Sequence, residues 1–179
     1  MFFASFVVKY VLCSLLYVLL APSPWYNSHV RQPLALFLTF KHLVDDMYAI
    51  LTKQFRFEAA HQLPNHRGKC ARLHGHSYLL EVSVRGLIQP TRGQSDDGMV
   101  IDLEQIKQLV NEIIIARVDH YNLNDFLSVP STAENIAHWM WDQLEQQAPE
   151  FAALLWRIRL WETASGYVEI SRAEREAQP

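Results

Sequence analysis

Alternating apolar and polar residues predict two long β-strands in the middle of the chain. Residues 53–61 and 77–88 both place an apolar side chain at nearly every second position. Because successive side chains on a strand point to opposite faces, each segment has one face suited to a core and one suited to water. The turn-rich residues 90–98 lead to a short third strand predicted at 99–101. The apolar positions are Phe55, Phe57 and Ala59 in the first strand and Tyr78, Leu80, Val82 and Val84 in the second.

The pattern changes to a helical period after the third predicted strand. Asp102 can cap a first helix, with Gln105 three residues on as in a capping box, and this helix should end near Arg117. A second helix should begin after Thr132 and end at Pro149. Apolar residues recur along both at helical spacing: Ile106, Leu109, Val110, Ile113 and Ile114 in the first, and Ile136, Trp139, Met140 and Leu144 in the second.

Two closing strands are predicted at residues 154–161 and 167–171, joined by the small residues 164–166. The chain therefore reads as strands, helix, helix, strands. That order predicts an α+β domain with an antiparallel sheet and both helices on one face.

Composition narrows the class of protein. With 179 residues, half of them hydrophobic, the chain has room for one domain, residues 47–179, and an appendage. A net charge of −3 argues against a strongly basic nucleic-acid-binding surface. The two cysteines, Cys13 and Cys70, do not make a disulfide framework, so reduced thiols and a cytoplasmic location are expected.

The first 46 residues differ from the rest, and three interpretations stay open. Residues 2–21 are almost wholly apolar, and their length suits a membrane helix of about 20 residues. They also suit a signal peptide, although no basic stretch precedes the apolar run. In the third interpretation, which we favour, translation starts at Met47, close before the first predicted strand. Membrane attachment is then not expected.

Three histidines suggest a metal site. His61 ends the first predicted strand, and His74 and His76 stand two residues apart around the start of the second. Residues i and i+2 of a strand share a face, so His74 and His76 can reach one ion, with His61 supplied by the partner strand. Three neutral imidazoles suit Zn²⁺ and leave its fourth position open, as in catalytic sites. His-Gly-His alone is weak evidence, and any polar turn can contain it.

Cys70 lies at the end of a polar loop, four residues before His74. A free cysteine is most often a small buried hydrophobe. Lys69 and Arg72 flank this one, however, and a nearby metal would further favour the thiolate. Cys70 is therefore a candidate general base.

Two carboxylates complete the set of candidate residues. Asp119 precedes His120 directly after the first helix, and such a pair can act as a proton relay, although a helix C-terminal cap is an equally good interpretation. Glu162 stands at the end of a strand rich in Trp, Leu and Ile. Most such glutamates are simply solvated, but a carboxylate there can accept two parallel N–H bonds from a heterocycle edge, as it does from arginine.

Together these motifs resemble the 6-pyruvoyl-tetrahydropterin synthase family over residues 50–172. The resemblance implies the tunnelling fold, with a four-stranded antiparallel sheet and two helices, assembled as trimers that stack into hexamers with active sites between subunits. Two departures are the segment 1–46, which has no counterpart, and Ser131, which stands where a proline usually precedes Thr132. The motifs that carry the resemblance are residues 57–61, 70–76, 119–125 and 161–163.

The resemblance also implies the roles of individual residues. Zinc would bind to His61, His74 and His76, and Cys70 would abstract a proton. Asp119 and His120 would form the protonating relay. Glu162 would anchor the pterin ring, with Thr132 as a second substrate-binding residue. A weaker expectation places the substrate's triphosphate near Arg67, Lys69 and Arg72.

The spacing of Cys70 from His74 and His76 is similar to the bacterial branch, the 6-carboxy-tetrahydropterin synthases of queuosine and deazapurine biosynthesis. That branch converts 7,8-dihydroneopterin triphosphate to 6-carboxy-tetrahydropterin, acetaldehyde and triphosphate, which makes this chain a predicted zinc-dependent lyase. Three alternatives stay open: a 6-pyruvoyl-tetrahydropterin synthase, a non-catalytic zinc- or pterin-binding protein, and a version tethered to a membrane by residues 2–21.

Overall fold

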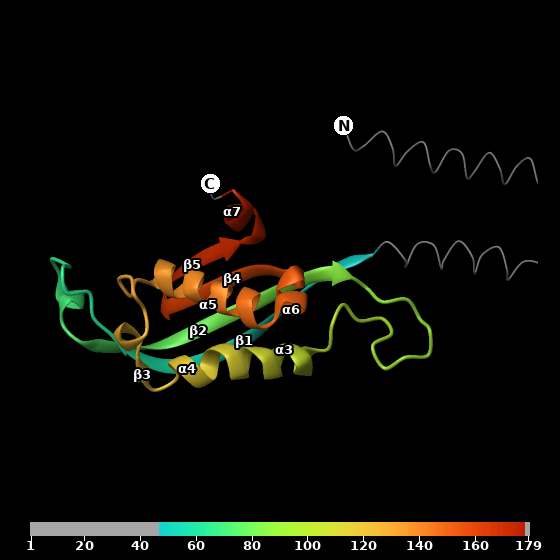
Figure 1. Ribbon diagram of the computed structural model, residues 1–179, viewed down its shortest axis with the longest axis horizontal. Helices are drawn as coiled ribbons and strands as arrows, with labels where there is room; N and C mark the ends of the chain where they lie inside the picture. The colour runs from blue at the N-terminus through green and yellow to red at the C-terminus, as the bar shows by residue number, and fades with distance from the viewer. Residues whose placement is uncertain (1–46, 178–179) are drawn as a thin grey trace, which may run out of the picture. The chain divides into compact units, whose positions relative to one another are not determined.

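Five strands form one mixed sheet in the order β3-β1-β2-β4-β5 (Figure 1). The computed structural model describes residues 47–177. The expectations for residues 2–21 and for Cys13 therefore lie outside the described residues. The four longer strands pair with one another antiparallel, and the short β3 runs parallel to β1. The strands are β1 (Tyr48–His61), β2 (His74–Leu87), β3 (Tyr121–Asn122), β4 (Leu155–Thr163) and β5 (Gly166–Ser171).

The hairpin of β1 and β2 follows the predicted alternation. Phe55, Phe57 and Ala59 are buried, whereas Arg56 and Glu58, which alternate with them, are exposed. In β2 the predicted apolar face is completely buried, with Tyr78 paired opposite Phe57. These apolar faces form the core side of the sheet.

The predicted four-stranded antiparallel sheet is correct for the long strands and incomplete for the sheet as a whole. The additional strand is β3, and residues 99–101 do not form a strand. The carboxylate of Asp97 accepts hydrogen bonds from the backbone N–H groups of Arg92, Gly93 and Gln94. This closes a compact turn that returns the chain to Gln89, whose N–H donates to the carbonyl of Met99 at 2.8 Å without a continuing ladder.

The first predicted helix forms one unbroken helix whose pitch changes along its length. It comprises α3 (Leu103–Val110), the π-helical segment η2 (Asn111–Ile115) and α4 (Ala116–Val118). Asp102 caps it as predicted, but its carboxylate accepts from the N–H of Glu104 at 2.8 Å rather than from that of Gln105. The expected capping box is therefore not the observed cap.

The second predicted helix is α5 (Ala133–Gln147), and the hydroxyl of Thr132 caps it by accepting from the N–H of Asn135 at 3.4 Å. Pro149 ends it as expected and also begins α6 (Pro149–Leu154), where proline suits the first helical position. Short elements complete the fold: the 3-10 turns η1 (Lys69–Ala71) and η3 (Leu123–Asp125), and α7 (Arg172–Glu176) at the C-terminal end.

Both long helices cover the same side of the sheet, as predicted. The core-facing residues of β1, β2 and β4 form one buried cluster with those of α3, η2 and α5. Within residues 47–177, none of the helices has the length and apolar character needed to cross a membrane. Within residues 47–177, the long helices thus pack on one face of the sheet (Figure 1).

Candidate metal centre

The three histidines meet at one end of the β1–β2 hairpin. His61 is the last residue of β1 and pairs directly opposite His74, the first residue of β2, while His76 pairs opposite Ala59. All three therefore point to the same face of the sheet, above Tyr78. Gly75 between them serves close packing, because a Cβ there would lie 3.2 Å from the carbonyl oxygen of Ala59.

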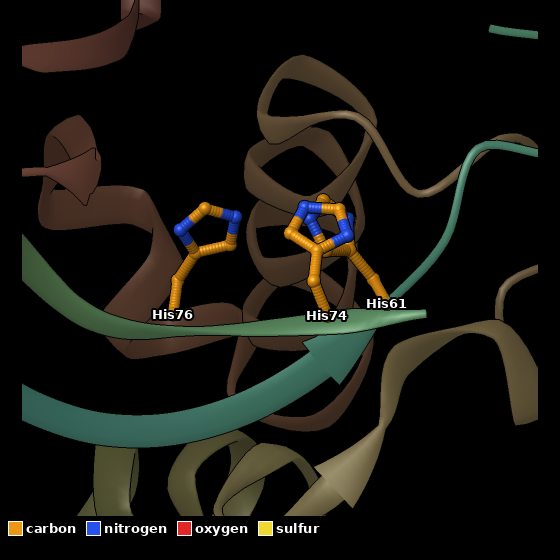
Figure 2. Close-up of side chains that lie close together, drawn as sticks. All are labelled: His61, His74 and His76. Carbon is orange, nitrogen blue, oxygen red and sulfur yellow. The ribbon is translucent and has the colours of Figure 1, made fainter. Parts of the chain in front are cut away.

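The imidazoles are close enough to share one ion. One ring nitrogen from each of His61, His74 and His76 lies within 4.8 Å of the corresponding nitrogen of the other two. The ring centroids are 4.5 Å apart for His61 and His74, 5.2 Å for His61 and His76, and 4.9 Å for His74 and His76. Figure 2 shows the three rings side by side above the hairpin. The predicted ligand set is thus brought together.

Backbone carbonyls fix the tautomer of two of these rings. Nδ1 of His61 lies 2.7 Å from the carbonyl oxygen of Ser131, and Nδ1 of His74 lies 2.8 Å from that of Arg72. A carbonyl can only accept, so each Nδ1 carries a hydrogen, and in the neutral ring each Nε2 has the free lone pair. Both Nε2 atoms are buried and have no hydrogen-bond partner among residues 47–177. Metal-bound histidines characteristically show this arrangement, which fits Zn²⁺.

The third ring is also prepared for binding in its neutral form. Burial lowers the pKa of His76, and the neighbouring His61 and His74 lower it further, while the carboxylate of Glu162 acts in the opposite sense. A neutral imidazole is the form that ligates a metal.

Glu162 reaches the centre from β4. Its Oε1 lies 3.5 Å from Nε2 of His61 and 4.0 Å from Nε2 of His76, and its side chain is 31% exposed. It follows the buried Ile158 and Leu160 on the core-facing side of β4. Glu162 is therefore a residue of the site and not a solvated strand end.

Tyr78 forms the floor of the centre. Its ring stacks on Phe57, with centroids 4.9 Å apart, and its side chain is fully buried. Burial raises the pKa of the Tyr78 hydroxyl, and the charge of the Glu162 carboxylate raises it further. The hydroxyl is consequently neutral and makes no hydrogen bond within the described part of the chain.

Cys70 lies in the loop that joins the two strands. It belongs to η1, is partly exposed, and its carbonyl accepts from the N–H of Leu63 at 2.8 Å, which closes the loop just beyond the end of β1. Its sulfur is not part of the group of ligand atoms within 4.8 Å of one another. This position is compatible with a base beside the centre and does not make Cys70 a fourth ligand.

Asp119 and His120 form the predicted pair, with Nδ1 of His120 3.0 Å from Oδ1 of Asp119. Asp119 is also the C-terminal cap residue of α4, as the alternative interpretation expected, and the role of the pair as a relay stays a prediction. Its carboxylate accepts from the N–H of Glu58 at 2.9 Å. This hydrogen bond lowers the pKa of Asp119, and the contact with His120 lowers it further. His120 has a left-handed backbone, with φ of 64°.

This pair stands beside β1, on the side where β3 pairs with it. The side chain of His120 is 77% exposed, and its N–H donates to the carbonyl of Glu58 on that edge. No hydrogen bond or ion pair within residues 47–177 links Asp119 or His120 to the metal ligands of the same chain. A shallow hollow beside the pair is lined in part by Gly75 and Ser77.

Three residues that position the site were not predicted from the sequence. Ser131 and Arg72 act through backbone carbonyls, which every residue type offers, so no sequence signal marks them. Asn124 holds both polar groups of the Gln62 peptide with its side-chain amide. It stands in an asparagine-rich connection, which was the available signal. Thr132 uses its hydroxyl to cap α5, and no contact tests its expected role toward substrate.

Comparison with known proteins places these features in a family context. The family model for 6-pyruvoyl tetrahydropterin synthase matches residues 50–173. The chain is 47% identical over 98 residues to a 6-carboxy-5,6,7,8-tetrahydropterin synthase from Synechocystis sp., covering 54% of this chain and 75% of that one. It is 31% identical over 140 residues to the enzyme of that name from Haemophilus influenzae, covering 66% and 96%. The solved 6-pyruvoyl tetrahydropterin synthase of Caenorhabditis elegans superposes with a TM-score of 0.61 at 27% identity, covering 70% and 96%.

Proposed function

The chain belongs to the 6-pyruvoyl tetrahydropterin synthase family, and on this premise we propose that it is a zinc-dependent 6-carboxy-5,6,7,8-tetrahydropterin synthase. Its substrate would be 7,8-dihydroneopterin triphosphate and its products 6-carboxy-tetrahydropterin, acetaldehyde and triphosphate, in queuosine biosynthesis in the cytoplasm. The observation that carries the proposal is the cluster of His61, His74 and His76, in which two buried Nε2 atoms have no hydrogen-bond partner within residues 47–177. The similarity to bacterial enzymes of that name supports this branch of the family.

The three histidines would hold the metal in their neutral forms. The carbonyls of Ser131 and Arg72 orient two of the rings, so little rearrangement is needed on binding. Zinc, when bound, supplies Lewis-acid polarisation of the substrate's side-chain hydroxyls. Three protein ligands leave one position for those hydroxyls.

Glu162 would orient the pterin ring. A carboxylate can accept two parallel N–H bonds from the amidine-like edge of the heterocycle, which fixes both distance and rotation. Its position beside His61 and His76 keeps the ring next to the metal centre. Holding a reacting carbon in line with a base is worth several kcal/mol, roughly up to 7–11 in the best-oriented cases.

Cys70 would remove a carbon-bound proton as its thiolate. The cationic side chains of Lys69 and Arg72 flank it in sequence. The closed loop between Leu63 and Cys70 holds the residue near the end of β1, on which His61 stands.

The pair of Asp119 and His120 would return a proton. Asp119 would hold the imidazole through Nδ1, 3.0 Å from its Oδ1, and so orient the ring. The pair stands on an exposed strand edge, and within residues 47–177 no hydrogen bond or ion pair joins it to the three histidines. We therefore place it in the active site of a neighbouring copy, within the homohexamer of stacked trimers that is typical of the family.

A 6-pyruvoyl-tetrahydropterin synthase is the second candidate. The chain is 36% identical over 134 residues to the 6-pyruvoyl tetrahydrobiopterin synthase of Poecilia reticulata, covering 66% of this chain and 86% of that one. Both reactions can use the same metal, base and ring anchor. They differ in whether the bond between the first two side-chain carbons is cleaved, so the products distinguish them.

Product analysis tests the proposal. The purified protein, loaded with zinc, is incubated with 7,8-dihydroneopterin triphosphate, and the products are identified by mass spectrometry beside a Cys70→Ala variant. Acetaldehyde and a carboxy-pterin, absent from the variant, are the expected result. A pyruvoyl product would support the second candidate, and no product at all would contradict both.

A further inference from the structure

Residues 121–124 hold the end of β1 along the strand edge that faces away from β2. Strand β3 runs parallel to β1, with Ala59 beside Tyr121 and Ala60 beside Asn122. Beyond Asn122 the backbone turns into η3 and leaves the sheet. The side chain of Asn124 then continues the pairing: Oδ1 accepts from the N–H of Gln62 at 2.8 Å, and Nδ2 donates to the carbonyl of Gln62 at 2.9 Å.

These two bonds act on the residue next to a metal ligand. A carboxamide has the donor and acceptor of a peptide group, so Asn124 matches both polar groups of Gln62 at once. The Gln62 carbonyl also accepts from the hydroxyl of Ser131 at 3.2 Å. His61 precedes Gln62 and is only 2% exposed. Its backbone is therefore held by Asn124 through Gln62, while its ring is held by the carbonyl of Ser131.

We propose that Asn124 is a positioning residue for the metal centre. By holding the backbone N–H and carbonyl of Gln62, it sets the position of Nε2 of His61. This inference rests on the proposed zinc centre. The end of β1 needs such a contact, because the chain continues from it into the polar loop 62–69, and within residues 47–177 the pairing of β1 with β3 ends at Ala60. Substituting a residue that supports a metal ligand typically lowers the metal affinity by about 10–100-fold.

Two substitutions of Asn124 separate the contribution of its Oδ1 acceptor from that of its Nδ2 donor. Asn124→Leu has a similar size and removes both hydrogen bonds. Asn124→Asp keeps an acceptor for the N–H of Gln62 but sets a carboxylate against its carbonyl oxygen. Gln54→Leu is the matched control, because it removes an amide hydrogen bond from β1, Gln54 Nε2 to Glu81 Oε1 at 2.9 Å, at a distance of several residues from the centre.

The test measures metal binding by the full chain. Zinc affinity is obtained by competition with a chromophoric chelator, and the environment of the ion from the visible absorption of the Co²⁺-substituted protein. We expect zinc to bind about tenfold or more weakly to both Asn124 variants, with an altered cobalt spectrum. The Gln54→Leu protein should match the wild type in both measurements.

Unchanged zinc affinity and cobalt spectra in the Asn124 variants would overturn the proposal, even with a lower melting temperature, because a merely structural contact gives that result. Asn124→Asp, the milder change, decides the question if Asn124→Leu does not fold. Failure of the wild type to bind zinc or cobalt would remove the zinc centre and this inference together. Binding by the wild type with no change in the variants removes only the inference.

Discussion

Nδ1 of His61 lies 2.7 Å from the carbonyl oxygen of Ser131, 70 residues further along the chain. Ser131 immediately precedes Thr132, the cap of α5, so the hydrogen bond joins the end of a strand to the start of a helix. The cluster of histidines is thus assembled by long-range packing as well as by the hairpin. Its zinc affinity should depend on the ligands, and the stability of the fold should depend on the bound ion and on pH.

Substituting His61 with phenylalanine should abolish zinc binding. The ring keeps a similar shape in its buried place, but the Nε2 lone pair is gone. We expect zinc affinity to fall by more than about 100-fold, which is the upper end of the loss seen when a residue that only supports a ligand is substituted. Chelator competition measures it, with His66→Phe as control, because His66 lies in the loop and contacts Gly68 instead. Equal losses in both variants would show that the ion binds elsewhere.

Adding zinc to metal-free protein should stabilise the fold. A ligand that binds only the folded state at a hundredfold excess over its dissociation constant contributes about 2.7 kcal/mol. For a domain of this size, that corresponds to a rise in melting temperature of roughly 10 °C. Differential scanning calorimetry with and without a chelator measures the shift. A melting temperature that does not depend on zinc would contradict a centre built into the core face.

The metal-free protein should lose stability as the pH falls through the ordinary histidine pKa of 6.5, because burial lowers the pKa of His76 in the folded state. Between that lowered pKa and 6.5 the unfolded chain binds more protons than the folded one, so acid favours unfolding. His76→Gln cannot take up this proton and should lose less stability. Urea unfolding at pH 7.5 and pH 5.5 gives both differences. Parallel losses in the two proteins would exclude His76 as a cause.

Substituting Asp119 with asparagine should slow catalysis without affecting zinc. The amide oxygen can still accept from the N–H of Glu58, so the strand edge is kept, but the charge that supports His120 is lost. General acid–base catalysis by a positioned group contributes typically about 10²–10⁴-fold, which bounds the expected fall in kcat. Steady-state kinetics give kcat, and chelator competition gives the zinc affinity. An unchanged kcat would exclude the relay.

Prediction from the sequence succeeded where the evidence was local and periodic. The two-residue period of the strands placed Phe57, Tyr78 and His76 on one face, and the structure confirms that arrangement. The caps Asp102 and Thr132 were also correct, because capping depends on residues two or three positions away.

Features that depend on distant contacts were missed. Strand β3 has two residues, and its alignment beside β1 relies on contacts made by Asp119 and Asn124. Residues 99–101 have an apolar character that suits a strand, but the turn closed by Asp97 leaves them without a ladder. Their intrinsic preference was overridden by the loop around them.

His120 is the one non-glycine residue of the described segment with a positive φ. A backbone of this kind typically costs about 1–3 kcal/mol, and glycine would relieve it. Its imidazole, however, is the group that the relay requires. Selection for thermal robustness alone would thus favour glycine at this position, whereas selection for turnover would retain histidine. Laboratory evolution of this protein toward heat resistance is therefore expected to sacrifice turnover at residue 120 unless both properties are screened together.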